Sequence, residues 1–192
     1  MSKPRILIGI TGASGALYAR RVLERLAIEG RHEILVVVSH AGRRLLFEEL
    51  GAEIGAPPGD FGSWLRIKTD HADGLRLLPV EDIGAGPASG SFRLDAMVIV
   101  PCSMRTLAAV SGGLADNLLT RAADVCIKES RRLVIVPREC PFSAIHLENM
   151  LRLARLGVRI VPPIPGFYRH PETLDDLVDF VVGKILAASC EK

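Results

Sequence analysis

Hydrophobic and polar positions along this chain form blocks that predict strands and helices in alternation. Short, mostly apolar segments rich in β-branched residues occupy 5–10, 33–39, 96–101, 132–137 and 158–165. Segments of this length and composition are typical of strands that are buried on both faces of a sheet. Residues 17–29 and 41–50 instead repeat apolar side chains at helical spacing, and Gly30 and Gly51 follow them as expected C-caps.

The second half of the chain predicts four further helices, over residues 103–113, 116–129, 143–157 and 173–189. Asp116 is a suitable N-cap for the second of them. The third carries an apolar stripe made of Leu147, Met150, Leu151, Leu153 and Ala154. The last helix is apolar round more than one face, which predicts either deep burial or a contact between subunits.

Residues 52–93 interrupt this alternation with prolines and glycines. We expect at most one short strand there, over residues 75–80, and a long loop that includes the Gly- and Ser-rich residues 84–91. Long loops inside compact domains are commonly functional lids. The interval is therefore expected to be an excursion from the sheet.

Apolar strands that alternate with helices predict an α/β fold. We expect a doubly wound parallel sheet in a Rossmann- or flavodoxin-like three-layer sandwich, with residues 1–192 as one domain. Ligands of such folds bind at the carboxyl ends of the strands. Four segments that directly follow predicted strands are therefore expected to line the site: residues 11–15, 39–42, 101–106 and 137–141.

The composition narrows the function classes. With 48% hydrophobic and 24% charged residues, the chain is expected to fold and not to be disordered. A net charge of +2 and a single Trp do not favour a nucleic-acid or membrane partner. No apolar run reaches the length of a membrane span, and we expect no signal peptide. The four cysteines lack metal-ligand spacing, so we expect no metal and a cytoplasmic location.

Three glycines at intervals of three punctuate the turn after the first predicted strand. Their spacing is neither the dinucleotide-binding fingerprint nor a P-loop. Ser39 and His40 end the second strand where an acidic residue would bind a ribose, which disfavours NAD. The turn carries the hydroxyls of Thr11 and Ser14 in front of a helix. It either holds a phosphate or is glycine-rich for steric reasons alone.

Polar residues after two other strands each leave two interpretations open. Ser103 and Thr106 can both cap the following helix, or they can bind a phosphate or a sugar together with its first-turn N–H groups. Arg138 and Glu139 form either a structural ion pair or an acid–base site.

Two cations and a tyrosine are further candidates. Arg121 and Lys128 lie seven residues apart on one face of a predicted helix, about 10 Å apart along its axis. They are either part of a solvated face, with Asp124 paired to one of them, or an anion site. Tyr168 follows a rigid, proline-rich segment, where its ring can pack while its hydroxyl reaches a partner.

Taken together, these stretches resemble the flavin prenyltransferases of the UbiX type. The resemblance spans residues 4–187 and rests on GITGASG (9–15), VVVS (36–39), PASGS (87–91), the long runs 101–129 and 131–157, and PPIPGFY (162–168). It implies an enzyme that transfers a dimethylallyl group from dimethylallyl phosphate to N5 and C6 of reduced FMN, without a metal. It also implies that the prenylated FMN passes to a partner UbiD-type decarboxylase, which serves ubiquinone biosynthesis in some bacteria. Members form homo-oligomers, so we expect a dodecamer with sites between subunits.

The resemblance also implies roles for individual residues. Contacts to FMN are expected from Gly12, Ala13, Ser14, Ser39, Ser103, Met104, Arg105, Thr106 and Arg138. The donor phosphate is expected to bind Arg121, Lys128, Tyr168 and Lys184. Lys184 departs from the arginine of several relatives, which keeps the charge but loses the bidentate fork. Catalysis is expected to involve Glu139 as acid and base, Ser14 near the reactive edge of the flavin, and Glu49 as a second acidic residue.

Three other functions compete with this one. An FMN-dependent cysteine decarboxylase of the same flavoprotein group would share the flavin turns, but it would carry an asparagine in the turn at 101–106 and a different substrate clamp. A non-catalytic flavin carrier would not need Arg121, Lys128, Glu139 and Tyr168 together. A direct aromatic-acid decarboxylase would release carbon dioxide without a partner protein.

Overall fold

The computed structural model describes residues 3–51 and 75–190. Most of the expected excursion, residues 52–74, lies outside the described residues, and so does that part of the expected lid. The remainder of the excursion contains one short strand, as expected, and a 3₁₀ turn that was not predicted.

Six strands form one parallel sheet: β1 (Arg5–Ile10), β2 (Glu33–Val38), β3 (Leu75–Leu78), β4 (Ala96–Cys102), β5 (Arg132–Pro137) and β6 (Arg159–Ile160). Their spatial order is β3-β2-β1-β4-β5-β6. This is the order of Rossmann folds, in which the chain runs outward in both directions from the centre of the sheet. The predicted doubly wound parallel sheet is confirmed.

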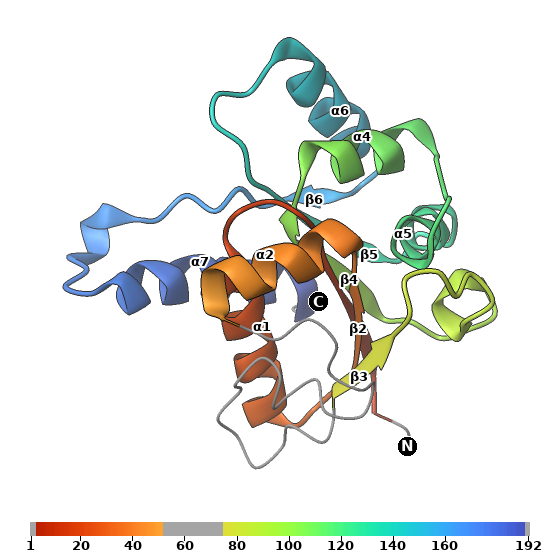
Figure 1. Ribbon diagram of the computed structural model, residues 1–192, viewed down its shortest axis with the longest axis horizontal. Helices are drawn as coiled ribbons and strands as arrows, with labels where there is room; N and C mark the ends of the chain where they lie inside the picture. Colours follow the sequence, from red (N-terminus) through yellow and green to blue (C-terminus); the bar gives the residue numbers. More distant parts are fainter. Residues whose placement is uncertain (1–2, 52–74, 191–192) are drawn as a thin grey trace.

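Among residues 3–51 and 75–190, six helices cover the sheet: α1 (Ala16–Glu29), α2 (His40–Leu50), α4 (Met104–Gly112), α5 (Leu118–Lys128), α6 (Ala144–Arg155) and α7 (Leu174–Cys190) (Figure 1). Two short 3₁₀ turns, η2 (Gly86–Ala88) and η3 (Phe167–Arg169), lie in the connections. The predicted C-caps Gly30 and Gly51 both adopt the left-handed conformation that ends a helix.

The core has two layers because successive residues of a strand face opposite sides of the sheet. Ile6 and Ile8 of β1 pack in one layer, with α1, α2 and α7. Leu7 of β1 packs in the other layer, with α4, α5 and Leu153 of α6. The apolar side chains of α7 from Val178 to Leu186 are buried against the first layer. Of the two alternatives expected for this helix, the structure thus shows burial within the chain.

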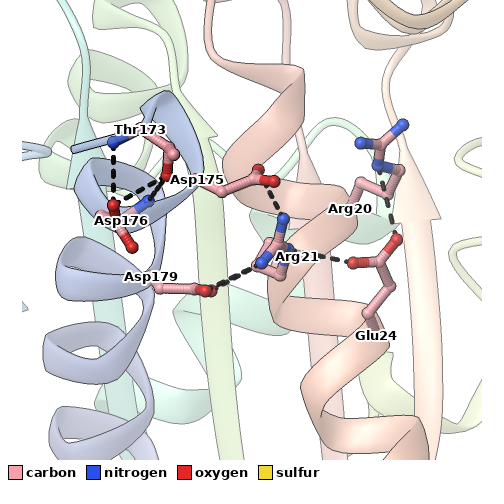
Figure 2. A network of polar contacts seen from close by, with 7 residues as sticks. All are labelled: Arg20, Arg21, Glu24, Thr173, Asp175, Asp176 and Asp179. Carbon is pink, nitrogen blue, oxygen red and sulfur yellow. Dashed lines mark hydrogen bonds and ion pairs between the residues drawn. The ribbon is translucent and has the colours of Figure 1, made fainter. Parts of the chain in front are cut away.

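Figure 2 shows how α7 is tied to α1 at the rim of this first layer. Arg21 of α1 bonds both carboxylate oxygens of Asp179 at 2.9 Å and one oxygen of Asp175 at 2.7 Å. Its Nε also lies 3.1 Å from Glu24. The Arg21 side chain is only 18% exposed, although its partner Asp175 is 66% exposed, so these ion pairs lie at the edge of the protein surface.

Two element boundaries differ from the prediction. Asn117, and not Asp116, caps α5, because its side-chain oxygen accepts from the Thr120 amide at 3.1 Å in a capping box. The last strand, which was expected within residues 158–165 and to break at their three prolines, is only two residues long, Arg159–Ile160. Prolines at 162, 163 and 165 have no N–H to donate to a ladder, which explains the early end.

The predicted stripe of α6 is largely exposed in the single chain. Leu153 alone is buried on this helix, while Leu147 and Leu151 are 53% and 51% exposed. Ile145 at the start of the helix is 68% exposed. The stripe therefore contributes Leu153 to the internal core, and Met150 packs against that core while half-buried.

Candidate functional site

The turns after β1 and β4 meet at the centre of the sheet, where the chain changes direction. Thr11 follows β1 and is buried. Its hydroxyl donates to the Pro101 carbonyl at 2.8 Å and accepts from the Ser103 amide at 2.8 Å. These bonds hold together two turns that are 90 residues apart in sequence. The carboxyl edge that the sequence singles out therefore has its two central turns directly connected.

Glycine is required in the first turn for a steric reason. A Cβ at Gly12 would lie 2.4 Å from the Ala41 Cβ at the start of α2. Gly42 is equally confined, since its Cβ would lie 2.6 Å from the Ile10 carbonyl. Along this turn, Gly12 is exposed, Ala13 is buried and Ser14 is half-buried.

Glu49 caps helix α1 from the side. The residue before the helix is Gly15, which has φ 114° and no side chain to act as an N-cap. The Glu49 carboxylate accepts from the Gly15 amide at 3.0 Å and from the Ala16 amide at 2.8 Å. This places the predicted acidic residue beside the turn of Ser14, where it satisfies two first-turn donors.

The turn after β4 forms a second helix N-terminus. Ser103 is the N-cap of α4: its hydroxyl accepts from the Thr106 amide at 3.3 Å and lies 3.1 Å from the Thr106 hydroxyl. Both side chains are half-buried, as is Met104, while Arg105 is exposed. Cys102 in the same turn is fully buried, and desolvation raises the pKa of its thiol far above the ordinary value, so it is not a thiolate nucleophile.

Ser39 repeats this arrangement after β2, where its hydroxyl caps α2 by accepting from the Gly42 amide at 3.0 Å. The neighbouring His40 lies 2.8 Å from Glu81 at the surface. Three hydroxyl-bearing helix N-termini or turns, at Ser14, Ser39 and Ser103, thus follow three adjacent strands.

Arg138 and Glu139 follow β5, and both are exposed. The Arg138 amide donates to the Cys102 carbonyl at 3.1 Å, which ties this segment to the turn after β4. The Glu139 carboxylate accepts from the Cys140 amide at 3.0 Å. Among the ion pairs of residues 3–51 and 75–190, neither side chain takes part, so a structural ion pair at this position is not what the structure shows.

Arg121 and Lys128 lie on α5, and each has an acidic neighbour. Arg121 lies 2.6 Å from Asp124 and donates through Nε to the Ala88 carbonyl at 3.2 Å. Lys128 pairs with Glu129. A Cβ at Gly90 would lie 2.8 Å from the Lys128 Nζ. Both cations therefore lie against the Gly- and Ser-rich loop of residues 84–91.

Tyr168 and Lys184 come together on a different part of the molecule. The Tyr168 ring packs edge-on against Phe180, with ring centroids 5.8 Å apart. The Lys184 Nζ lies 5.8 Å from the centroid of the same ring. Tyr168 is 72% exposed. Its neighbours Gly166, Arg169, Phe180 and Lys184 help to line a hollow of about 680 Å³.

The four residues expected to bind the donor phosphate thus form two separate pairs in one chain. Figure 1 shows α5 at one side of the molecule and the light-blue segment that precedes α7 at the opposite side. Arg121 and Lys128 lie on α5, Tyr168 lies in that light-blue segment, and Lys184 lies on α7 itself. One chain alone does not bring the two pairs together.

Sequence reasoning did not identify several groups that hold these residues in place. The carbonyl of Ala88 and the carboxylate of Glu129 were not predicted as partners of the α5 cations, and the cap formed by Glu49 was not predicted either. The three-residue spacing of Arg121 and Asp124 did signal their ion pair. A carbonyl contact between loop and helix leaves no such signal.

The arrangement fits a flavin phosphate and ring system better than a metal. Close-packed glycine turns and the half-buried hydroxyls of Ser14, Ser39 and Ser103 line the carboxyl edge of β1, β2 and β4. Within the described part of the chain, no cluster of three or more His, Cys, Asp or Glu side chains is placed to hold a metal ion.

Comparisons with known proteins agree with this geometry. The model of the family described as Flavoprotein matches residues 1–186. The chain is 48% identical to the flavin prenyltransferase UbiX of Pseudomonas aeruginosa, covering 97% of this chain and 90% of that protein. It is 42% identical to the flavin prenyltransferase UbiX of Methanocaldococcus jannaschii, covering 95% and 91%.

Solved structures show the same similarity. A structure of AnUbiX (PadA1) in complex with FMN and dimethylallyl pyrophosphate is 40% identical, with a TM-score of 0.83 over 97% of this chain and 92% of that one. A dodecameric FMN-dependent UbiX-like decarboxylase from Escherichia coli O157:H7 is 42% identical, with a TM-score of 0.82 over 95% and 92%. The chain belongs to the Flavoprotein family and, within it, to the UbiX-type flavin prenyltransferases.

Proposed function

We infer that this chain is a flavin prenyltransferase that transfers a dimethylallyl group from dimethylallyl phosphate to N5 and C6 of reduced FMN. The observation that carries this inference is the carboxyl edge of the sheet. At this edge, the Thr11 hydroxyl links the turns after β1 and β4 by hydrogen bonds. The turn after β5 is bonded to the turn after β4 through the Arg138 amide. These turns carry the residues that match the family's flavin site.

The flavin is proposed to bind across this edge. Gly12, Ala13 and Ser14 provide one wall, and Ser39 provides a hydroxyl next to it. Ser103 and Thr106 offer hydroxyls and the N-terminal amides of α4, where negative charge is favoured. Met104, Arg105 and Arg138 complete the proposed flavin set. A preformed, close-packed edge of this kind suits a planar ligand that carries one phosphate.

The donor phosphate is proposed to bind between subunits. Arg121 and Lys128 from one chain and Tyr168 and Lys184 from another would together neutralise the leaving phosphate, which eases cleavage of the allylic carbon–oxygen bond. The separation of α5 from the segment that carries Tyr168 within one chain supports this arrangement (Figure 1). So does the dodecameric relative, and we propose that this chain also assembles as a dodecamer.

Proton transfer is assigned to Glu139, whose exposed carboxylate is held at the flavin edge by the Cys140 amide. Ring closure at C6 requires loss of a proton, and a carboxylate at this edge can accept it. Glu49 and Ser14 lie beside each other at the start of α1 and are proposed to assist at the reactive edge of the flavin.

We further propose that the prenylated FMN passes to a UbiD-type decarboxylase, in a pathway such as ubiquinone biosynthesis. All four cysteines are free thiols, which supports a reducing, cytoplasmic location. No helix in the described portion is both long and apolar enough to cross a membrane. The single sheet with a helical layer on each face supports one domain as the functional unit.

The cysteine decarboxylase alternative has less support. The FMN-dependent cysteine decarboxylase TvaF is only 14% identical to this chain, with a TM-score of 0.64, which is a likeness of fold. A direct decarboxylase deserves a test, because relatives at 42% and 36% identity are described as a UbiX-like decarboxylase and a phenylacrylic acid decarboxylase.

The decisive experiment is anaerobic incubation of the purified protein with reduced FMN and dimethylallyl phosphate, followed by mass spectrometry of the extracted flavin. We expect the flavin to gain one five-carbon prenyl unit. Dimethylallyl pyrophosphate in a parallel reaction distinguishes the two donors. Unmodified FMN with both donors would overturn the proposal, and release of carbon dioxide from an aromatic acid by the protein alone would favour a decarboxylase.

A further inference from the structure

Thr11 occupies the point where β1 and β4 end side by side. The pairing of these strands runs from Ile6 opposite Ala96 to Gly9 opposite Ile99. Two residues further on, Pro101 has no amide hydrogen and cannot continue the ladder as a donor. The Thr11 amide still donates to the Pro101 carbonyl at 3.2 Å. Without another contact, the chain beyond Pro101 would be held to β1 by this one long bond.

The Thr11 hydroxyl supplies the missing contact. It donates to the Pro101 carbonyl at 2.8 Å and accepts from the Ser103 amide at 2.8 Å. Both bonds are shorter than the backbone bond beside them. The side chain is only 1% exposed, so its two bonds form where water does not compete for them. A hydroxyl can donate one hydrogen bond and accept another at the same time, as Thr11 does here.

The residues on either side of this bridge are those proposed to hold the flavin. Gly12 to Ser14 follow Thr11 directly, and Ser103 to Thr106 follow the amide that Thr11 binds. Thr11 itself is too deeply buried to touch a ligand at the edge. Its effect on a ligand must therefore act through the spacing and orientation of the two turns.

We propose that Thr11 is a positioning residue of the flavin site, which sets the separation of the turns after β1 and β4 before FMN arrives. This inference rests on the proposed function for the identity of the ligand. A ligand that contacts both turns binds best when their geometry is already correct, because ordering them on binding would cost affinity.

The first test uses three variants and measures the Kd for FMN by quenching of flavin fluorescence, together with Tm. In Thr11→Val, which keeps the shape but loses both bonds, we expect the Kd to rise about tenfold, equivalent to about 1.4 kcal/mol. Thr11→Ser keeps the hydroxyl and should stay within about twofold of wild type. Ser189→Ala removes another buried hydroxyl, bonded to the Leu186 carbonyl at 3.0 Å at the far end of α7. It should lower Tm without changing the Kd.

Two results would overturn the proposal: a Thr11→Val protein that binds FMN as tightly as wild type, or a Thr11→Ser protein as impaired as Thr11→Val. A second measurement does not depend on a variant that folds. In the ligand-free wild-type protein, the Ser103 amide should be strongly protected from hydrogen exchange, whereas rapid exchange would refute the bridge. Failure of the wild-type protein to bind FMN would instead count against the proposed function, and the exchange measurement would still test Thr11.

Discussion

At the scale of single residues, the proposed site depends on two carboxylates that backbone amides hold in place. Glu139 is exposed beyond the end of β5, and its carboxylate is oriented by one backbone amide. Glu49 is oriented by two amides of α1. The two glutamates therefore differ. The Glu139 carboxylate is the one proposed to transfer a proton, whereas the Glu49 carboxylate binds two amides at the N-terminus of α1.

Replacement of Glu139 by Gln tests the first part. The variant keeps the size of the side chain but cannot accept a proton, so we expect kcat to fall by at least about a hundredfold. Binding of FMN should remain normal. Steady-state formation of prenylated FMN and an FMN titration measure the two quantities, with Glu148→Gln on the exposed face of α6 as the matched control. Activity equal to wild type would remove Glu139 from the mechanism.

Replacement of Glu49 tests the second part. Glu49→Ala leaves the amides of Gly15 and Ala16 without their partner and should cost about 1 kcal/mol of stability, typical of a lost N-cap. Glu49→Gln keeps an acceptor oxygen and should lose less. Chemical denaturation measures both. Glu48→Ala is the control, because Glu48 contacts only Arg44 at the surface among the described residues. Equal stability of Glu49→Ala and wild type would contradict the cap.

At the scale of elements, the start of α7 shows how a local cap supports a distant helix contact. Thr173 and Asp176 cap the helix reciprocally: the Asp176 carboxylate accepts from the Glu172 and Thr173 amides at 3.0 and 2.8 Å. One turn on, Asp179 bonds Arg21 of α1 (Figure 2). The same end of α7 adjoins the hollow that contains Lys184.

This cap makes the stability of α7 depend on pH in a known direction. Hydrogen bonds from the Thr173 hydroxyl and from the Thr173 and Glu172 amides lower the pKa of Asp176 below its ordinary value of 3.8. A lowered pKa in the folded state means that the stabilisation is complete above that ordinary value and is lost as the pH falls through the folded pKa.

The difference in Tm between wild type and Asp176→Asn measures this effect. We expect wild type to be more stable at about pH 6, and we expect the difference to shrink toward about pH 3 as the carboxylate is protonated. Asp175→Asn serves as a comparison on the same turn. A difference that stays constant, or grows, as the pH falls would show that the charge of Asp176 does not stabilise the cap.

At the scale of the whole molecule, the proposed phosphate site is complete only if chains associate. Helix α5, which carries Arg121 and Lys128, and the segment that precedes α7, which carries Tyr168, lie at opposite sides of one chain (Figure 1). The chain also exposes large apolar side chains, including Leu147 and Leu151 on α6 and Phe167 beside Tyr168. Exposed apolar side chains next to an incomplete polar site are typical of an interface between subunits.

Mixing of inactive variants tests whether the site is shared. Arg121→Ala and Lys184→Ala should each be almost inactive alone. Mixed oligomers of the two should regain activity at about a quarter of the sites, because those sites draw both intact pairs from different chains. A mixture of Arg121→Ala and Lys128→Ala is the control, since every site then carries one defect on α5. The absence of recovery in the first mixture, despite mixed assembly, would show that each site belongs to a single chain.

Much of this protein follows from its sequence alone. Apolar β-branched runs such as 5–10 and 132–137 can be stable only when buried on both sides, so they predict the parallel sheet and its helical layers. The rule that ligands bind at the carboxyl ends of the strands then selects the turns at Thr11 and Ser103. These inferences succeed because they depend on local periodicity and on a general property of the fold.

Other features were decided only by tertiary structure. The exposure of Leu147 and Leu151 depends on which elements pack over α6, and helical spacing does not contain that information. Asn117 caps α5 in place of its acidic neighbour because its side chain, and not that of Asp116, reaches the Thr120 amide. The two bonds of the Thr11 hydroxyl join residues that only the order of the strands brings together. Sequence pattern therefore determined the elements and the edge that carries the site, whereas long-range packing determined how the residues at that edge are held.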